Sequence, residues 1–348
     1  MCRVSGVGYV QPVETAFIEK GGTNMSAKNH SLRLPAAAAI AAVASVLALF
    51  AATPPVEAAF PGTNGRIVFE RDPDGYRGPQ DPEIYSVNLK GENPVRLTDN
   101  ATGDTQPAFS ADGRKIVYSG GRKALDSYSA DIFVMNANGS GKTRVIRERE
   151  MPGAAAANDG QPAFSPSGRR IAFVRNGRGT NDDIYAIGTD GGNPKRLVDI
   201  PNFEYRSGGQ PAWSPNGARI AFFSGSEDAY SIETVKPDGT GRKPVTEGYA
   251  PNWSPDGLKI AFHRSPDGSE SKIYVANADG SDEVPLSTGE GAYDSDPVFS
   301  PGGGKVIFAS ARDGDYDLYI TNADGSDEPQ QLTNYPGDER SPDWQPIR

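Results

Sequence analysis

Three aspartates at alternate positions form the clearest candidate for a metal-binding site in this sequence. Asp313, Asp315 and Asp317 lie in the run Asp-Gly-Asp-Tyr-Asp, and oxygen ligands spaced in this way suit a hard cation such as calcium. The run does not match an EF-hand, because glycine is missing at the sixth position and glutamate at the twelfth. The structural alternative is that Asp317 begins a strand and pairs with Arg312. Calcium is the one cofactor that the sequence suggests.

Nucleophilic catalysis and chemistry at softer metals have few candidate residues. The chain has one cysteine, Cys2, and two histidines, of which only His263 lies after residue 58. A Ser-His-Asp triad would need this histidine, and no Gly-x-Ser-x-Gly motif follows residue 58. The segment 138–143 ends like a phosphate-binding loop, but Asn136 stands where the first glycine of that motif belongs. We therefore expect a protein that is not an enzyme.

The N-terminal region reads as a targeting segment. Residues 36–52 are apolar or small, follow the basic Lys28 and Arg33, and precede a Thr-Pro-Pro break. This order is typical of a secretory signal, and the small residues at its end predict cleavage after Ala58. We thus expect residues 1–58 to be a signal peptide with an upstream extension before Met25. The alternative is an uncleaved membrane anchor.

Charge limits the partners that the chain can bind. The formal net charge is -10 and the isoelectric point is near 4.9, which argues against a nucleic-acid binder that relies on a basic patch. Together with the leader, this predicts an exported protein of the periplasm, cell envelope or extracellular space.

The elements that position these residues come from an internal repeat. Its full copies read PAFSADGRKIVYSG, PAFSPSGRRIAFVR, PAWSPNGARIAFFS, PNWSPDGLKIAFHR and PVFSPGGGKVIFAS, and they begin at Pro107, Pro162, Pro211, Pro251 and Pro297. Each copy predicts two short strands joined by a Ser-Pro-Asp-Gly-like turn, in which proline presets φ and glycine accepts the left-handed conformation. A third strand of the Asp-Ile-Tyr type and a short fourth strand follow in each unit.

Two partial copies complete the set. TNGRIVFE at Thr63 has only the second half of the motif, and SPDWQP at Ser341 has only the first. Four antiparallel strands in each of six units predict an all-β, six-bladed propeller over residues 59–348. We expect the C-terminal strand around Trp344 to pair with the first strand, which closes the ring and removes two free sheet edges.

The repeats resemble a known family, the propeller domain of TolB and related exported proteins. The resemblance rests on the P-x-W-S-P-D-G-x-x-I-A-F units and covers nearly all of residues 59–348. The repeats also resemble the propeller that precedes the hydrolase domain of prolyl-oligopeptidase-like enzymes. TolB carries an additional N-terminal α/β domain that this sequence does not match. The resemblance therefore implies the propeller fold, and it does not by itself imply the Tol-Pal assembly role of TolB.

Strand parity selects a face for partner binding. Connections from the second to the third strand, and from each blade to the next, share one face and vary in length, as binding loops do. On this face we predict partner-binding residues, namely Asp104, Asp159, Tyr205, Tyr249, Tyr293, Asp294, Asp338 and Tyr335. The structural alternative is that Asp104, Asp159, Asp294 and Glu339, each three residues before a strand-A proline, accept backbone amides at the strand starts.

The sequence therefore predicts a binding scaffold. We expect a monomer without a membrane span after cleavage, which recognises a protein or peptide of the cell envelope through a basic segment and binds no nucleic acid. The alternative is a calcium-assisted or carbohydrate-directed enzyme that uses the same acidic face. One blade breaks the pattern, because Glu233 stands where later blades have tyrosine. We expect a one-residue bulge to bring Tyr230 to that position instead; the alternative is that Glu233 marks a functional pocket.

Overall fold

The computed structural model describes residues 63–75, 81–121, 130–146, 157–177, 182–200, 207–226, 229–266, 270–288 and 292–347. The predicted leader lies outside these ranges. All regular structure in the described residues is β, and the 24 strands form six four-stranded antiparallel sheets. The described residues contain no helix that is long and apolar enough to cross a membrane.

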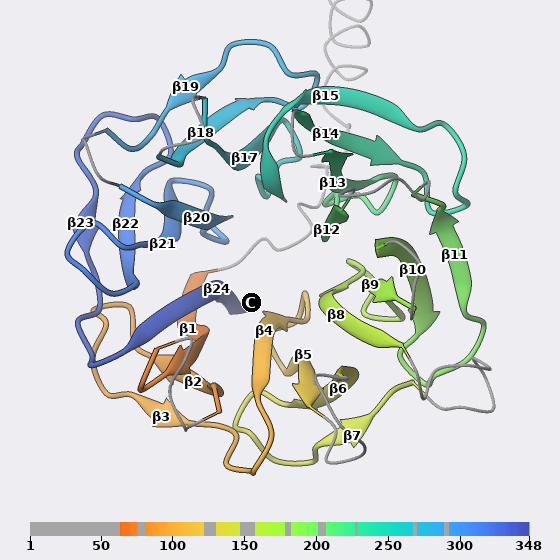
Figure 1. Cartoon of the computed structure of the whole chain (residues 1–348), viewed down its shortest axis with the longest axis horizontal. Helices are drawn as coiled ribbons and strands as arrows, with labels where there is room; N and C mark the ends of the chain where they lie inside the picture. The colour runs from red at the N-terminus through yellow and green to blue at the C-terminus, as the bar shows by residue number, and fades with distance from the viewer. Residues whose placement is uncertain are drawn as a thin grey trace, which may run out of the picture. The chain divides into compact units, whose positions relative to one another are not determined.

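The six sheets are arranged as blades around a central channel, as Figure 1 shows. We letter the strands of a blade A to D from the channel outward. The A strands are β24 (Asp338–Ile347), β4 (Asp104–Phe109), β8 (Asn158–Phe164), β12 (Ser207–Trp213), β16 (Tyr249–Trp253) and β20 (Asp294–Phe299) of blades 1 to 6. The B strands are β1 (Thr63–Asp72), β5 (Lys115–Gly121), β9 (Arg170–Asn176), β13 (Ile220–Ser226), β17 (Lys259–Arg264) and β21 (Lys305–Ser310).

The outer half of each blade is made of a longer C strand and a short D strand. The C strands are β2 (Glu83–Val87), β6 (Ala130–Asn136), β10 (Asp182–Gly188), β14 (Ala229–Val235), β18 (Lys272–Asn277) and β22 (Asp317–Asn322). The D strands are β3 (Val95–Arg96), β7 (Thr143–Arg144), β11 (Lys195–Val198), β15 (Lys243–Glu247), β19 (Val284–Pro285) and β23 (Gln330–Gln331). Short outer strands limit the unpaired edge that each blade presents to solvent.

The ring closes as predicted. The C-terminal strand β24 pairs antiparallel with β1, with Trp344 opposite Ile67, so blade 1 combines both ends of the propeller. Trp344 is only 4% exposed and packs with Phe69 and Ile307, the latter from blade 6. Closure therefore buries a large aromatic side chain between the first and last blades.

The repeated turn has the predicted conformation. In blade 5 the amide of Gly257 donates to the carbonyl of Ser254 at 2.9 Å, and Gly257 has a φ of +71°. The Ser254 hydroxyl donates to Asp256 at 2.6 Å and accepts the amide of Lys259 at 2.8 Å. Serine, aspartate and glycine thus each have a defined task in the A–B turn.

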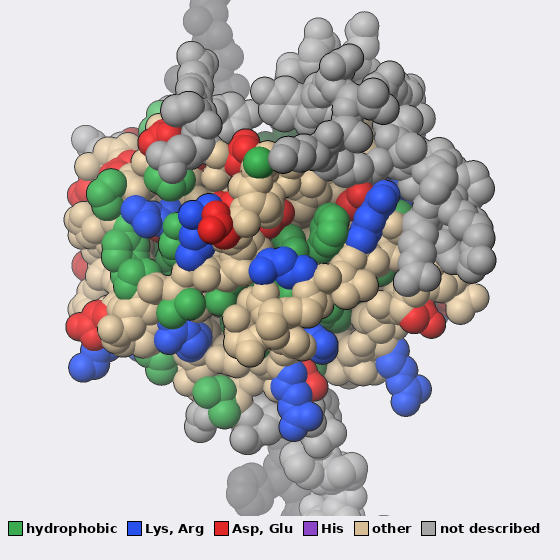
Figure 2. Space-filling model, turned by 90° about the horizontal axis from the view of Figure 1, so that it is seen from below, with side chains coloured by type: hydrophobic (Ala, Val, Ile, Leu, Met, Phe, Trp, Pro, Cys, Tyr) green, Lys and Arg blue, Asp and Glu red, His purple; other side chains and the backbone are tan. Residues whose placement is uncertain are grey.

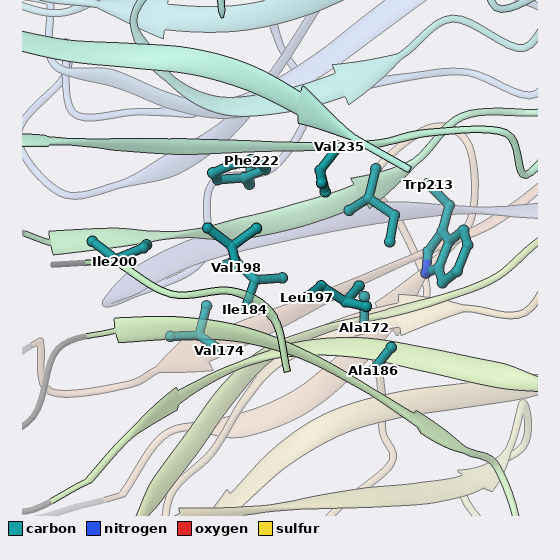
Figure 3. Packing of buried hydrophobic residues seen from close by; sticks show 11 residues of the cluster. Ala172, Val174, Ile184, Ala186, Leu197, Val198, Ile200, Trp213, Phe222 and Val235 are labelled. Atoms are coloured by element: carbon teal, nitrogen blue, oxygen red, sulfur yellow. The ribbon is translucent and has the colours of Figure 1, made fainter. Parts of the chain in front are cut away.

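Aromatic residues at the ends of the A strands fill the spaces between blades. Figure 3 shows Trp213 of blade 4 with Val198 and Ile184 of blade 3, and with Phe222 and Val235 of its own blade. Its counterparts Phe109, Phe164, Phe299 and Trp344 are buried in the same way. In blade 5 the counterpart Trp253 is half-buried and packs against Ile260 and Phe262, so the repeat places one aromatic side chain of each blade in the packing between blades.

Candidate functional site: the channel mouth and the loop face

The two faces of the propeller carry different connections. The A–B and C–D turns lie on one face, which we call the turn face, and the B–C and D–A connections lie on the other, which we call the loop face. Several loop-face connections, including 201–206 with the predicted Tyr205, lie outside the described residues. The following description covers the rest of the loop face and the channel beneath it.

A ring of left-handed residues surrounds the channel. The residue before the A-strand proline has a φ between 48° and 53° in every blade, and the six residues are Gln106, Gln161, Gln210, Ala250, Asp296 and Ser341. The A–B pairing shifts register at the same place in each blade. This backbone is costly for residues other than glycine. Its sixfold recurrence brings these residues to the wall of a cavity of about 150 Å³.

Hydrogen bonds connect this ring from blade to blade. The Glu70 carboxylate accepts the amide of Gln106 at 2.8 Å, and the Gln106 side chain accepts the amide of Gln161 at 2.8 Å. The Gln161 side chain in turn accepts the amide of Gln210 at 2.7 Å. The Gln210 side chain then donates to Asp296 of blade 6 at 2.6 Å. The channel mouth is thus a connected polar network that satisfies the left-handed backbone.

The acidic groups of the channel have altered affinities for protons. Burial, opposed by the Gln106 amide and reinforced by nearby Asp296, raises the pKa of Glu70 to about 7. Burial also raises the pKa of Asp343 to about 7, although this carboxylate accepts the amide of Phe109 at 2.6 Å. The pKa of His263 is lowered by burial, against the attraction of Asp296 and Asp294. The mouth therefore holds acids that titrate near neutral pH beside a histidine that favours its neutral form.

In three blades the acid three residues before the A-strand proline is buried against an arginine. Asp159 of blade 3 lies 3.2 Å from Arg175, and Asp294 of blade 6 lies 3.0 Å from Arg312. In blade 1, Glu339 lies 3.4 Å from Arg71. Burial and the neighbouring Asp317 raise the pKa of Glu339 to about 9, and Arg71 opposes this shift. We call these pairs the acid-arginine clamps.

Blade 2 has an acid at this position, Asp104, but it has no arginine opposite it. Gly120 takes the place of the arginine, and a Cβ there would come within 2.7 Å of Phe133. Asp104 instead accepts the side-chain amide of Asn100 at 2.6 Å. Burial and then the charge of Glu83 raise the pKa of Asp104 to about 6.

These contacts correct the prediction of a surface field from Asp104, Asp159 and Asp294. Their exposed fractions are 3%, 0% and 0%, so the carboxylates face the protein interior and not a partner. The structural alternative of backbone amides holds for Glu339, which accepts the amide of Tyr335 at 3.5 Å, whereas Asp159, Asp294 and Asp104 also have the side-chain partners Arg175, Arg312 and Asn100. The fourth acid, Asp338, is half-buried, lies 3.1 Å from Arg340 and accepts the amide of Tyr316.

Blade 4 also departs from the prediction made for Glu233. No bulge intervenes between β13 and β14, because Phe222 pairs with Glu233 just as Phe262 pairs with Tyr274 in blade 5. Glu233 therefore occupies the aromatic position, where Arg242 donates to it at 2.5 and 2.6 Å. The Arg242 guanidinium lies 5.4 Å from the centre of the Phe222 ring and takes over the stacking role of the missing tyrosine.

Tyr230, which was predicted to take the position of Glu233, belongs instead to an aromatic cluster on the loop face. Tyr230 and Tyr249 have ring centres 4.5 Å apart, Phe223 lies 5.4 Å from Tyr249, and His263 stacks on Tyr249 at 5.2 Å. All four side chains are half-buried. Gly248 makes room for them, since a Cβ at this residue would come within 2.7 Å of Phe262. The cluster joins blades 4 and 5, which lack clamps.

The other two described tyrosines of the prediction differ in exposure. Tyr293 is 51% exposed and directly precedes the A strand of blade 6. Tyr335 is half-buried, donates from its hydroxyl to the carbonyl of Gly91 at 2.6 Å, and lies beneath the Arg71 guanidinium. Tyr293 is thus available on the surface, whereas Tyr335 supports the structure of blade 1.

The carboxylates predicted to bind calcium do not converge. Asp313 accepts the hydroxyl of Tyr319, Asp315 accepts the amide of Gly337 at 3.2 Å, and Asp317 accepts the side chain of Gln331 at 2.8 Å. The structural alternative, a pair of Asp317 with Arg312, is not formed, because Arg312 lies 3.0 Å from Asp294. In the part of the chain that the structure describes, no group of three or more His, Cys, Asp or Glu residues could hold a metal ion.

Comparison with known proteins places the chain in a family. The profile of the TolB beta propeller domain matches residues 124–296 and 250–347, so the chain belongs to this family. TolB from Acinetobacter baumannii superposes with a TM-score of 0.65 at 22% identity, over 81% of this chain and 67% of that one. A putative TolB from Agrobacterium tumefaciens gives 0.57 at 18% identity, over 82% of this chain and all of that one. At these identities the likeness shows the fold.

A curated relative matches only locally. The uncharacterized peptidase YuxL of Bacillus subtilis is 29% identical over 99 residues, which are 28% of this chain and 14% of that protein. The chain therefore spans a small part of the length of this relative.

The sequence did not point to the channel network. Its members Glu70, Gln106, Gln161, Gln210 and Asp296 were not among the predicted site residues. A signal was present, because three repeats place glutamine directly before the A-strand proline. A polar side chain repeated at one inward position of a propeller is a candidate for the channel wall.

Proposed function

We propose that this TolB-like propeller is an exported, non-catalytic binding scaffold of the cell envelope or extracellular space. Its partner docks on the loop face over blades 4 to 6. The observation that carries this proposal is the aromatic cluster of Phe223, Tyr230, Tyr249 and His263, with the exposed Tyr293 as a further aromatic contact. Half-exposed aromatic side chains on a rigid scaffold are the usual anchors of protein interfaces.

The channel supports a binding role more than a catalytic one. Its two cavities have volumes of about 150 and 100 Å³, below the roughly 300 to 1,000 Å³ typical of small-molecule sites. The polar groups at the mouth are engaged with one another, as the bond from Gln210 to Asp296 illustrates. A partner would therefore rest on the mouth, and a long basic side chain is the group that could reach into it.

Charge at the mouth favours a basic segment in the partner. Asp104, Asp159 and Asp294 cannot supply this attraction because they are buried, but Glu70 and Asp296 are half-buried at the channel itself. Aromatic faces beside carboxylates suit lysine or arginine through combined cation–π and ionic contacts.

The test compares capture of envelope proteins by matched variants. A Tyr249→Ala/Tyr293→Ala protein should lose partners that wild type retains, and the affinity of a purified partner should fall about tenfold or more. Asp256→Asn on the turn face is the control and should leave that affinity unchanged. Equal melting temperatures would show that the double variant is folded. Partners that ignore the tyrosines but depend on Asp256 would overturn the proposal.

A further inference from the structure

The turn face carries an uneven distribution of charge. In blades 2 to 4 the turns 110–115, 136–143, 165–170, 188–195, 214–219 and 236–243 contain ten basic and three acidic residues. The basic residues are Arg114, Lys115, Lys142, Arg169, Arg170, Lys195, Arg219, Lys236, Arg242 and Lys243, and the acidic ones are Asp112, Asp190 and Asp238. We call this part of the turn face the basic half. Figure 2 shows Lys and Arg side chains projecting along one rim of the propeller.

The turns of blades 5 and 6 have the opposite sign. Turns 254–259, 277–284, 300–305 and 322–329 contain two basic residues, Lys259 and Lys305, against seven acidic ones. The acidic residues are Asp256, Asp279, Asp282, Glu283, Asp324, Asp327 and Glu328. We call this part the acidic half. The turn face therefore carries formal charges of +7 and -5 on its two halves, obtained as 10 − 3 and 2 − 7.

Much of this charge is directed outward. Arg114, Arg169 and Lys236 are exposed and form no ion pair with any described residue. The acids of the C–D turns bind their own loops, as Asp279 does with Ser281, and these bonds lower the pKa of Asp279. Hydrogen bonds within the turns lower the pKa of Asp324 and Asp327 in the same way, which favours the charged form of these carboxylates.

We propose that two copies of this chain associate through their turn faces, with the basic half of each against the acidic half of the other. A two-fold axis between the faces can place blade 3 of one copy over blades 5 and 6 of the other. The same operation then repeats the contact on the opposite side, as an isologous interface requires. The presence of both charges on one face favours a second copy over a purely anionic partner, which could use only the basic half.

Shape and apolar contact agree with this arrangement. The turn face has a groove of about 750 Å³ between blades 2 and 3, lined by Lys115, Thr143 and Asp190 among others. A second groove of about 530 Å³ lies between blades 5 and 6 and includes Asp256 and Asp324. Beside it Leu258 is 67% exposed at the tip of an A–B turn. Each half therefore combines a charged rim with a groove that could receive turns of the other copy.

This proposed dimer differs from the monomer expected from the sequence and is independent of the proposed loop-face function. Sedimentation of the full chain at about 0.05 M salt should show a dimer that dissociates at about 0.5 M, where screening acts over shorter distances. The variants Arg114→Glu/Arg169→Glu and Asp324→Lys/Glu328→Lys should each associate at least about tenfold more weakly than wild type. None of these residues lies on the loop face.

Mixing the two variants gives the decisive measurement. In a homodimer of either variant the introduced side chains face native charges of the same sign, and the formal charge of the altered half falls from +7 to +3 or from -5 to -1. In an equimolar mixture the introduced glutamates face the introduced lysines and the unaltered halves face one another, so a heterodimer should form. A protein that stays monomeric at low salt would overturn the proposal, and so would a dimer that both variants preserve or a mixture that does not associate. Binding of monomeric wild type, but not of Arg114→Glu/Arg169→Glu, to vesicles with anionic headgroups would overturn it in favour of a lipid surface.

Discussion

Blades 1, 3 and 6 place an acid against an arginine where blades 4 and 5 place aromatic rings. In blade 6 the Asp294 carboxylate is fully buried beside Arg312. In blade 5 the corresponding position is Gly248, and Arg264 turns outward to Glu283, which is 27% exposed. The same strand positions therefore serve two purposes, since the clamps hold neighbouring strands together and their absence leaves room for the aromatic cluster.

This difference separates residues that stabilise from residues that bind. A buried ion pair contributes specificity of structure, and removing one partner is strongly unfavourable because a charge remains buried. Half-exposed rings can be removed at lower cost to folding, although they dominate interface energies. We therefore expect the clamp blades to be sensitive in stability measurements and the aromatic blades in binding measurements.

The largest effect on stability should come from the seam of blade 1. Trp344→Ala removes a side chain that is 4% exposed and packed between the first and last blades, and should lower the free energy of unfolding by about 3 to 5 kcal/mol. Denaturant titration measures this change, with Trp344→Phe as a milder control. An unchanged unfolding midpoint in the alanine variant would mean that β24 does not close the ring.

Two arginines test the difference between clamped and unclamped blades. Arg312→Met leaves Asp294 buried without its cation and should cost about 3 kcal/mol or more. Arg264→Met removes the partner of the more accessible Glu283 and should cost about 1 kcal/mol or less. Both side chains also stack over tyrosine, at 4.5 Å from the ring centres of Tyr319 and Tyr274. Because the stacking is matched, equal losses of unfolding free energy would show that burial of the acid is not the cause.

The fold could be predicted from the sequence because the repeat contains its own boundaries. The Ser-Pro-Asp-Gly turns fix where the A and B strands meet, and the split first and last copies predict which strands close the ring. The turns follow from the local conformational preferences of proline and glycine, and the strand that closes the ring follows from the order of the repeats, so both can be recognised in the sequence.

The site was harder to predict than the fold. The alternating direction of the strands shows on which face of the propeller a residue lies, but it does not show how deeply its side chain is buried. Asp159 and Asp294 were assigned to the correct end of their strands, but their burial depends on Arg175 and Arg312 in neighbouring segments. The channel ring was missed for a different reason. A residue before proline is expected to be extended, whereas Gln106 and Gln161 are left-handed because tertiary hydrogen bonds hold them.

Stability should depend on pH through the acids of blade 1 and the channel. The folded pKa of Glu70 is raised from 4.5 to about 7, so this residue binds its proton more tightly in the folded state than in the unfolded state. Its stabilising contribution is complete below pH 4.5 and is lost as the pH rises to about 7. Asp343 acts in the same direction between 3.8 and about 7.

The measurement for this effect is the melting temperature as a function of pH. The melting temperature should fall less between pH 5 and pH 7.5 in Glu70→Gln than in wild type. The side-chain oxygen of the introduced glutamine can still accept the backbone N–H of Gln106, but this side chain does not titrate. Tyr293→Ala on the same face is the control and should keep the wild-type slope. A slope that Glu70→Gln leaves unchanged would assign the dependence to other groups.

The smallest effect should be that of calcium on the clamp side of the loop face. Asp313, Asp315 and Asp317 have separate protein partners, namely Tyr319, Gly337 and Gln331. Binding to the folded state at 100 times the dissociation constant would add about 2.7 kcal/mol, which corresponds to a rise of about 4 °C in a propeller of this size. We expect millimolar calcium to shift the melting temperature by less than about 1 °C, and EDTA to have no effect. A rise of several degrees in wild type that is absent from Asp313→Asn/Asp315→Asn would show that these carboxylates rearrange around a cation, and would restore the alternative of a calcium-assisted protein.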